Sequence, residues 1–245
     1  TIPFLLFALF QLKFAIITPA IISGSFAERI RFRSYILFML LFTIFIYSPL
    51  AHMTWHPDGL FRTWGVLDFA GGTVVHMSAG LAAFTGAIFL GQRKKIIEKP
   101  ANIPFVILGT GMLWFGWFGF NAGSALGANF DAVVAFANTS LASATSMITW
   151  IFYDRFSNRK MSSIGACIGA IVGLVAITPA AGFVTLGQSI FIGFIAAVVS
   201  NIAVKLNKKS KVDDTLDVFA THGIGGIVGM ILTAVFANEV GLIYG

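Results

Sequence analysis

The sequence predicts an all-α membrane protein that crosses the bilayer eight times, and three observations support this fold class. The 245-residue chain is 57% hydrophobic and only 11% charged. Its mean hydropathy is +0.88, well above that of a soluble globular domain. Apolar runs of about 20 residues recur along the chain, which is the length that spans a bilayer as an α-helix. Transmembrane β-strands would alternate apolar and polar residues, and these runs do not.

The candidate spans are separated by joints rich in Pro, Gly and charged residues. They cover residues 1–22, 32–53, 68–91, 103–126, 131–152, 162–180, 186–204 and 217–237. The chain starts inside an apolar run and has no signal-peptide pattern, so we expect it to be part of a longer protein. The single cysteine, Cys167, excludes an internal disulfide, and we expect it to pack as a small apolar residue.

Lys and Arg are confined to alternate joints. The joints at 23–31, 92–102, 153–161 and 205–216, with Arg33 beside the first, hold 14 of the 16 Lys and Arg residues, whereas the other joints hold only Arg62. By the positive-inside rule, we expect these four joints to be cytoplasmic, residue 1 to be external and the protein to lie in the cell (inner) membrane. The basic charge then faces the membrane surface, so the net charge of +6 does not indicate nucleic-acid binding.

Two segments share an acid and a histidine at the same spacing. Asp68 and His76 are eight residues apart, as are Asp214 and His222, and small residues follow each histidine. The first of these helices enters from outside and the second from the cytoplasm, which indicates an inverted-topology repeat of the kind that transporters use. The histidine helix is the fifth span of the second half but only the third of the first half. Equal halves therefore require two more spans before the first residue.

The two histidines are predicted to meet within the membrane. Each lies about 12 Å along its helix from its acid, and the helices enter a core about 30 Å thick from opposite faces. The remaining gap of about 6 Å is within reach of two side chains, and the small residues let the helices cross closely. Neutral rings in contact would line a narrow path. The alternatives are two ordinary core histidines, or a haem-b electron-transfer subunit with two ligating histidines. We interpret His52 and His56 as interfacial.

Asp68 has two interpretations that are compatible with each other. A carboxylate at the start of a helix is a common N-cap, because it bonds free N–H groups and favours the positive end of the dipole. Asp68 also lies at the outer face, where it can form part of an external cation site. Asp214 at the inner face is more typical of an N-cap alone.

Aromatic residues gather on the segments that reach the outer face. Phe120 and Ser124 are one helical turn apart in "WFGWFGFNAGSALG", and Phe10 and Phe14 are spaced likewise in "FQLKFAIITPA". Trp55 follows a span that exits outside, where an interfacial Trp is also common. Together these residues can form a cage that holds a small cation by cation–π contacts, with the Ser124 hydroxyl as acceptor.

These motifs resemble the ammonium transporter family (Amt/Mep/Rh). "DFAGGTVVHMSAG" is similar to the family signature, and "GWFGFNAGSA", "FAERIRF", "AHMTW" and "DVFATHGIGGIVG" are similar to further family segments in the same order. The resemblance implies a homotrimer of eleven-span protomers, in which 1–91 is the end of the first repeat and 103–237 the second. It also implies a PII-type protein as a partner on the cytoplasmic face, and neither a cofactor nor a metal. The chain departs from this pattern in its eight visible spans and in Lys13, a charge inside the first span.

The resemblance also implies roles for the singled-out residues. They are Phe10, Trp55 and Ser124, with Asp68, for external recruitment; Phe14 and Phe120 for a phenyl gate; and His76 and His222 for the pore. We expect a transporter rather than an enzyme: ammonium loses its proton below the gate, and ammonia passes the histidines. An ammonium-sensing domain fused to a signalling module remains open as an alternative.

Overall fold

The computed structural model describes residues 2–94, 100 and 102–243, and these ranges contain helices and no strand. The α-helices are α1 (Phe4–Phe26), α2 (Phe32–Phe42), α3 (Ser48–Trp55), α4 (Leu60–Thr63), α5 (Ser78–Leu90), α6 (Ile103–Gly123), α7 (Phe130–Phe156), α8 (Ser163–Ile177), α9 (Leu186–Lys209) and α10 (Ile224–Phe236). Within the described ranges, seven helical stretches are long and apolar enough to cross a membrane. The predicted all-α membrane class is confirmed.

The predicted span 162–180 is the one that differs most from its prediction. Its helix, α8, has 15 residues, which gives a length of about 22 Å and falls short of a bilayer core. Thr178 and Pro179 follow its end directly, and proline cannot continue a helical hydrogen-bond pattern. Most of α8 is buried among the other helices rather than exposed to lipid.

Three of the spans contain π-helical turns, which the apolar pattern did not predict. They are η1 (Thr43–Tyr47) between α2 and α3, η2 (Gly72–Met77) before α5, and η3 (Phe219–Gly223) before α10. The span predicted from residue 68 therefore begins at Gly72, and α5 and α10 each continue from a wider turn. Such turns are rare in proteins and frequently occur at functional sites.

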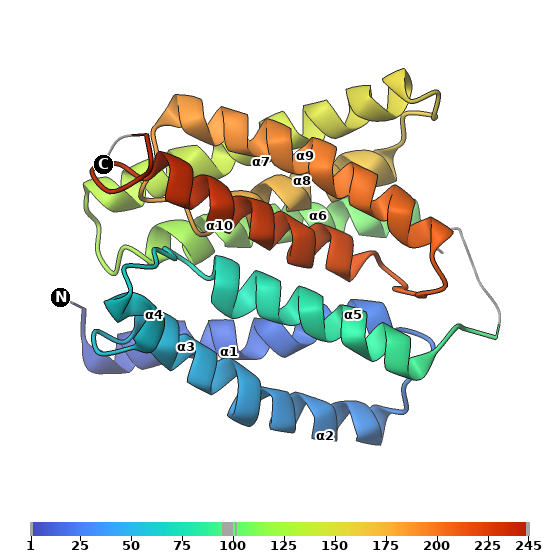
Figure 1. Ribbon diagram of the computed structural model, residues 1–245, viewed down its shortest axis with the longest axis horizontal. Helices are drawn as coiled ribbons and strands as arrows, with labels where there is room; N and C mark the ends of the chain where they lie inside the picture. Colours follow the sequence, from blue (N-terminus) through green and yellow to red (C-terminus); the bar gives the residue numbers. More distant parts are fainter. Residues whose placement is uncertain (1, 95–99, 101, 244–245) are drawn as a thin grey trace.

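The continuous helices η2–α5 and η3–α10 lie side by side in the middle of the molecule and run in opposite directions (Figure 1). Figure 1 shows α1 to α4 on one side of this pair and α6 to α9 on the other. The turn η2 contacts α10, and η3 contacts α5. The two histidine-bearing segments thus cross at the centre of the fold, as an inverted repeat predicts.

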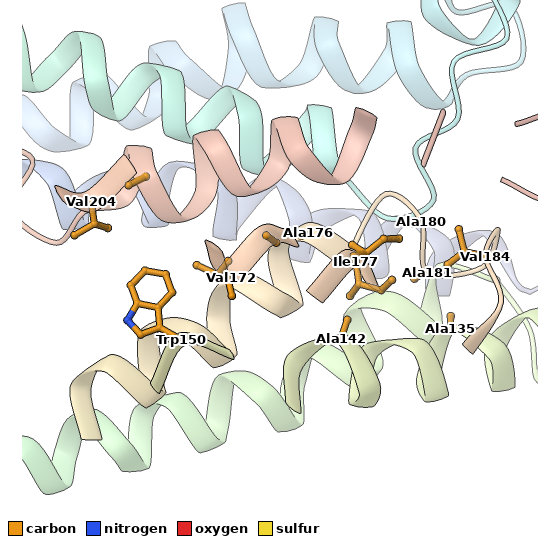
Figure 2. Packing of buried hydrophobic residues seen from close by; sticks show 14 residues of the cluster. Ala135, Ala142, Trp150, Val172, Ala176, Ile177, Ala180, Ala181, Val184 and Val204 are labelled. Atoms are coloured by element: carbon orange, nitrogen blue, oxygen red, sulfur yellow. The ribbon is translucent and has the colours of Figure 1, made fainter. Parts of the chain in front are cut away.

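The second half is held together by tight packing of α7, α8 and α9. Figure 2 shows the buried apolar residues of this cluster, which are mostly small, with Trp150 as the large exception. A Cβ on Gly173 of α8 would lie 2.4 Å from the backbone oxygen of Ala142 on α7, so only glycine fits there. Close approach through small residues replaces the hydrophobic effect as the main source of helix association inside a bilayer.

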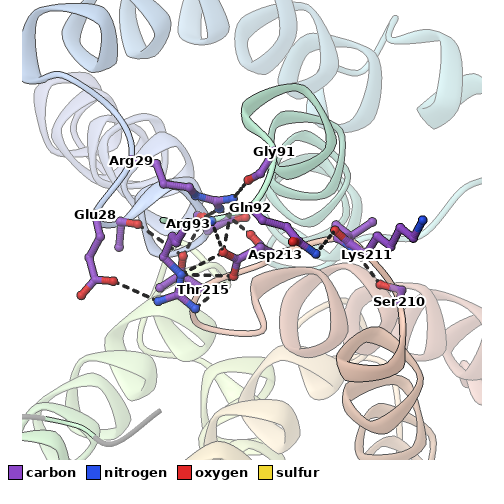
Figure 3. A network of polar contacts seen from close by, with 12 residues as sticks. Glu28, Arg29, Gly91, Gln92, Arg93, Ser210, Lys211, Asp213 and Thr215 are labelled. Atoms are coloured by element: carbon purple, nitrogen blue, oxygen red, sulfur yellow. Dashed lines mark hydrogen bonds and ion pairs between the residues drawn. The ribbon is translucent and has the colours of Figure 1, made fainter. Parts of the chain in front are cut away.

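A network of ion pairs joins three of the basic joints at one end of the molecule (Figure 3). Asp213 pairs with Arg93 at 2.9 Å and with Arg29 at 3.8 Å, and Arg93 also pairs with Glu28 at 3.0 Å. Burial disfavours the ionised carboxyl of Asp213, but the hydrogen bonds and charge of Arg93 outweigh it and lower its pKa below the ordinary value. These ion pairs therefore link the joint after α1, the joint after α5 and the joint before η3.

The fourth basic joint lies beside the end of α9. Arg159 pairs with Asp154 at 2.5 Å, and Asn201 of α9 donates to Asp154 at 3.0 Å. Lys205 of α9 donates to Ser157 at 3.1 Å. Since α9 leads into the joint that holds Asp213, these contacts place all four basic joints at the same end of the molecule. The cytoplasmic orientation of this end stays a prediction.

The outward surface of the helices is apolar. Phe89 is 89% exposed and Phe115 is 80% exposed, which suits side chains that face lipid rather than water. Lys13 is exposed on α1 within this surface and makes no ion pair among the described residues.

Candidate functional site

The two histidines contact each other where the two helices cross. The Nδ1 atoms of His76 and His222 are 3.2 Å apart, their ring centroids are 5.3 Å apart, and the rings are tilted by 36°. His76 is fully buried and His222 is half-buried. The contact predicted from the matched spacing is therefore present, and each ring belongs to a π-helical turn.

Glycines make this crossing possible, as predicted. A Cβ on Gly80 would lie 2.2 Å from both the Cα and the N atom of Gly223. A Cβ on Gly226 would lie 3.1 Å from the Cβ of His76. Because no side chain separates the backbones, the rings reach each other from helices that enter from opposite ends.

Two further side chains fix His76 that the sequence analysis did not single out. Trp117 of α6 stacks on its ring at a centroid distance of 5.4 Å and an angle of 18°. Thr178 places its Oγ1 3.3 Å from the Nε2 of His76 and accepts a hydrogen bond from the Nε1 of Trp117 at 3.0 Å. Trp117 lies one turn before Phe120 in the quoted motif, which was a usable signal, whereas nothing in the sequence marks Thr178.

The two gate candidates contact each other directly. The rings of Phe14 and Phe120 have centroids 4.5 Å apart and are tilted by 48°. Phe14 is only 2% exposed. Phe120 also stacks on His76 at 5.9 Å. The phenyl pair therefore lies next to the histidine pair.

Two of the outer recruitment candidates join the same aromatic cluster. The ring of Phe10 packs on Phe14 at 4.9 Å, and Trp55 packs on Phe14 at 5.6 Å. Ser124 ends α6, and its Oγ donates to the carbonyl of Phe120 at 2.9 Å. That bond uses the only hydroxyl proton, so the oxygen lone pairs of Ser124 are left to accept from a ligand.

Asp68 is hydrogen-bonded to the start of η2 and to Trp55. Its Oδ1 accepts from the backbone N–H groups of Gly71 and Gly72 at 2.7 Å each, and its Oδ2 accepts from Thr73 at 2.8 Å. Its backbone carbonyl accepts from the indole Nε1 of Trp55 at 3.0 Å. The capping interpretation thus accounts for the carboxylate, and the same residue anchors both η2 and Trp55.

Asp214 has a similar place at the other end. It is 6% exposed, and its Oδ2 accepts from the N–H of Phe219, the first residue of η3, at 2.7 Å. Three or more His, Cys, Asp or Glu side chains do not gather anywhere in the described ranges in a way that would hold a metal ion. The chemistry of this site is therefore that of aromatic faces, a hydroxyl and two imidazoles.

Comparisons with known proteins identify the family of this chain. The profile of the Ammonium Transporter Family matches residues 1–244. An ammonium transporter of Aquifex aeolicus is 52% identical over 99% of this chain and 59% of its own length, and one of Bacillus subtilis is 50% identical over 97% and 59%. The chain thus spans a little over half the length of these curated relatives.

Solved structures show the same arrangement of helices. The crystal structure of Candida albicans Mep2 matches with a TM-score of 0.92 and 40% identity, over 98% of this chain and 54% of that one. A protein described as a sensor Amt protein matches with a TM-score of 0.88 and 33% identity, over 94% of this chain and 60% of that one. By its sequence profile and by its fold, this chain belongs to the Ammonium Transporter Family.

Proposed function

We propose that the full-length protein carries ammonium across the membrane, with recruitment at the outer aromatic cluster. The rings of Phe10 and Trp55 offer π faces that attract a small cation. The Ser124 oxygen supplies a hydrogen-bond acceptor beside them. Asp68 keeps Trp55 in place through its carbonyl and holds the start of η2 through its carboxylate. Recruitment then depends on Asp68 without direct contact between the carboxylate and the ion.

The phenyl pair separates recruitment from conduction. Phe14 and Phe120 place apolar rings between the outer cluster and His76. A permanent cation that passes this point would lose its hydration shell without any compensating charge, which costs many kcal/mol. Ammonium can instead give up its proton, which on this proposal crosses by a separate polar route, and continue as ammonia. The His76–His222 contact supports this proposal most strongly, because two neutral rings provide polar edges to a neutral solute in an otherwise apolar path.

Transport by reconstituted full-length protein tests this function. Liposomes that contain the protein should show uptake on an ammonium gradient, with potassium excluded. Phe120→Ala should change the flux or admit potassium, whereas Phe115→Ala, on the exposed side of the same helix, should leave both unchanged. Absence of uptake by the wild-type protein, or identical behaviour of the two variants, would contradict the proposal.

The cytoplasmic face and the assembly form a second part of this proposal. With the four basic joints inside, the full-length protein forms a homotrimer in the cell membrane and binds a PII-type protein from the host on that face. A cysteine introduced at the exposed Ser210, in a Cys167→Ser background, should not react with an impermeant reagent in intact cells. Co-purification with the host PII protein, with and without nucleotide, tests the partner, and its absence in every state would remove it.

A sensing role is the second candidate, because a solved sensor Amt protein shares the fold. A signalling module fused to this domain in the full-length protein would favour the sensing role. A haem subunit fits poorly. A haem with a histidine on each face places the porphyrin between the two rings, whereas these Nδ1 atoms lie 3.2 Å apart. An absorption spectrum of the purified protein without a Soret band would exclude it.

A further inference from the structure

Thr178 has a hydroxyl group whose hydrogen bonds can be assigned completely. Its Oγ1 lies 2.8 Å from the carbonyl of Leu174, 3.0 Å from the Nε1 of Trp117 and 3.3 Å from the Nε2 of His76. A hydroxyl has one proton to donate and two lone pairs that accept. The indole N–H can only donate, so it occupies one lone pair. The Leu174 carbonyl can only accept, and its short distance is typical of an O–H···O bond, so it takes the proton.

One lone pair of Thr178 then remains, and it faces the Nε2 of His76. This contact is a hydrogen bond only if the Nε2 of His76 carries a proton. Because a charged ring in this fully buried position would be costly, the ring is neutral and its Nδ1 has no proton. The Nδ1 of His222, 3.2 Å away, must therefore donate the proton that joins the two rings.

We propose that Thr178 is a positioning residue that fixes the tautomer of both histidines. In this arrangement His76 is protonated at Nε2 and His222 at Nδ1, which leaves the Nε2 of His222 as the one free acceptor nitrogen of the pair. The two rings are therefore not equivalent. The consequence for transport rests on the proposed function: an ammonia molecule beside the pair donates an N–H to His222 and not to His76.

The position of Thr178 is itself held firmly against η2. The carbonyl of Pro179 accepts from the N–H of Phe69 at 3.0 Å. A Cβ on Gly72 would lie 2.7 Å from the Pro179 ring, so the glycine lets the end of α8 approach the turn that bears His76. The hydroxyl is thus fixed relative to the ring that it orients.

Nitrogen NMR of the full-length protein in lipid tests the assignment. The resonance of each ring nitrogen reports whether it carries a proton. Val75–His76 is the only Val–His pair in the sequence and Thr221–His222 the only Thr–His pair. Labelling with carbonyl-13C valine and 13C,15N-histidine therefore selects the signals of His76, and labelling with carbonyl-13C threonine and 13C,15N-histidine selects those of His222. Neither needs a substitution. The expected spectrum has His76 protonated at Nε2 and His222 protonated at Nδ1.

Substitutions of Thr178 distinguish positioning from packing. Thr178→Val keeps the shape of the side chain and removes the acceptor for the Nε2 of His76. The population with His76 protonated at Nδ1 and His222 at Nε2 should then rise by at least about fivefold relative to the wild-type arrangement. Thr178→Ser keeps the hydroxyl and should retain the wild-type spectrum. Thr233→Val is the matched control, because Thr233 bonds only to the carbonyl of Gly229 within its own helix. If Thr178→Val does not fold, Thr178→Ala takes its place.

Three results would overturn the proposal. They are an unprotonated Nε2 on His76 in the wild type, a mixture of both arrangements in the wild type, or an unchanged ratio when the hydroxyl is removed. Ammonium uptake measured on the same samples tests the transport function separately from the tautomer assignment. Loss of uptake by the wild type with the expected spectrum would refute the transport function and leave the tautomer assignment standing.

Discussion

Segments 68–77 and 214–223, named the outer and the inner segment after the predicted topology, carry the same elements in opposite directions, and they are anchored differently. Each has an aspartate, then a residue with positive φ three positions later, then a π-helical turn that ends near a histidine. In the outer segment the aspartate accepts three backbone hydrogen bonds, whereas Asp214 accepts one. The outer turn is therefore held mainly by its own carboxylate.

The inner segment is held by its neighbours instead. Asp213 precedes the inner aspartate and is fastened by Arg93 and Arg29, whereas Leu67 stands at the matching outer position. The residue with positive φ also differs: it is Gly71 outside and Asp217 inside. One fold therefore supports the two histidine-bearing turns by a local cap at one end and by an ion-pair network between joints at the other.

The largest effect is expected where the two segments cross. Gly80→Ala should lower the free energy of unfolding by about 3 kcal/mol or more, because its Cβ would lie 2.2 Å from the Gly223 backbone. Ammonium uptake should be lost with it. Gly187→Ala on α9 has nothing within 4 Å and should be neutral or slightly stabilising. Thermal unfolding and vesicle uptake are the measurements, and wild-type values for Gly80→Ala would refute the tight crossing.

The second comparison tests the two caps. Asp68→Asn turns one acceptor oxygen into an amide donor that faces an N–H group, so it should cost about 3 kcal/mol of stability. Asp214→Asn can still accept from Phe219 and should cost about 1 kcal/mol. Thermal unfolding of both variants in the full-length protein measures the difference. Equal losses would mean that the outer cap is no stronger than the inner one.

The contact between the two histidines was predictable from the sequence, because the spacing between each aspartate and its histidine predicts how far along its helix each ring lies. Two acids eight residues from two histidines, on helices of opposite direction, predict both rings near the middle of the bilayer. The apolar runs likewise predicted the helices, since lipid leaves the backbone few other ways to satisfy its hydrogen bonds.

The π-helical turns and Thr178 were not predictable from the sequence. A π turn and an α turn have the same apolar pattern over five residues, so periodicity does not separate them. The role of Thr178 depends on where the short helix α8 ends relative to η2, which is set by packing between distant parts of the chain. The pairing of Asp213 was likewise not predictable, because its partners come from two other joints.

The positive-φ residues provide a smaller test of the same comparison. A Cβ on Gly71, at φ 121°, would lie 2.7 Å from the Cγ2 of Val75, so Gly71→Ala should cost about 1–3 kcal/mol. Asp217 adopts φ 54° despite its side chain, and Asp217→Gly should gain about 0.5–1 kcal/mol from the relieved strain. Chemical or thermal unfolding of the two variants gives the signs. Destabilisation by Asp217→Gly would show that its side-chain contacts outweigh the strain.

The smallest effect is a dependence of stability on pH that arises from Asp217 in the inner segment. Burial raises the pKa of the Asp217 carboxyl from 3.8 to about 6, although Lys208, 3.9 Å away, opposes the shift. Because this folded-state pKa lies above the unfolded one, the group contributes stability that is fully present below about pH 4. That contribution is lost as the pH rises through about 6.

Asp217→Asn should therefore remove part of the decline in melting temperature between about pH 4.5 and pH 7. Asparagine tolerates the left-handed conformation, so the backbone is kept. Asp131→Asn is the matched control, because Asp131 is exposed and makes no ion pair among the described residues. The outer segment has glycine at the equivalent position and nothing to titrate there. Parallel curves for Asp217→Asn and the wild type would refute the raised pKa, and the two ends would then differ only in how they are anchored.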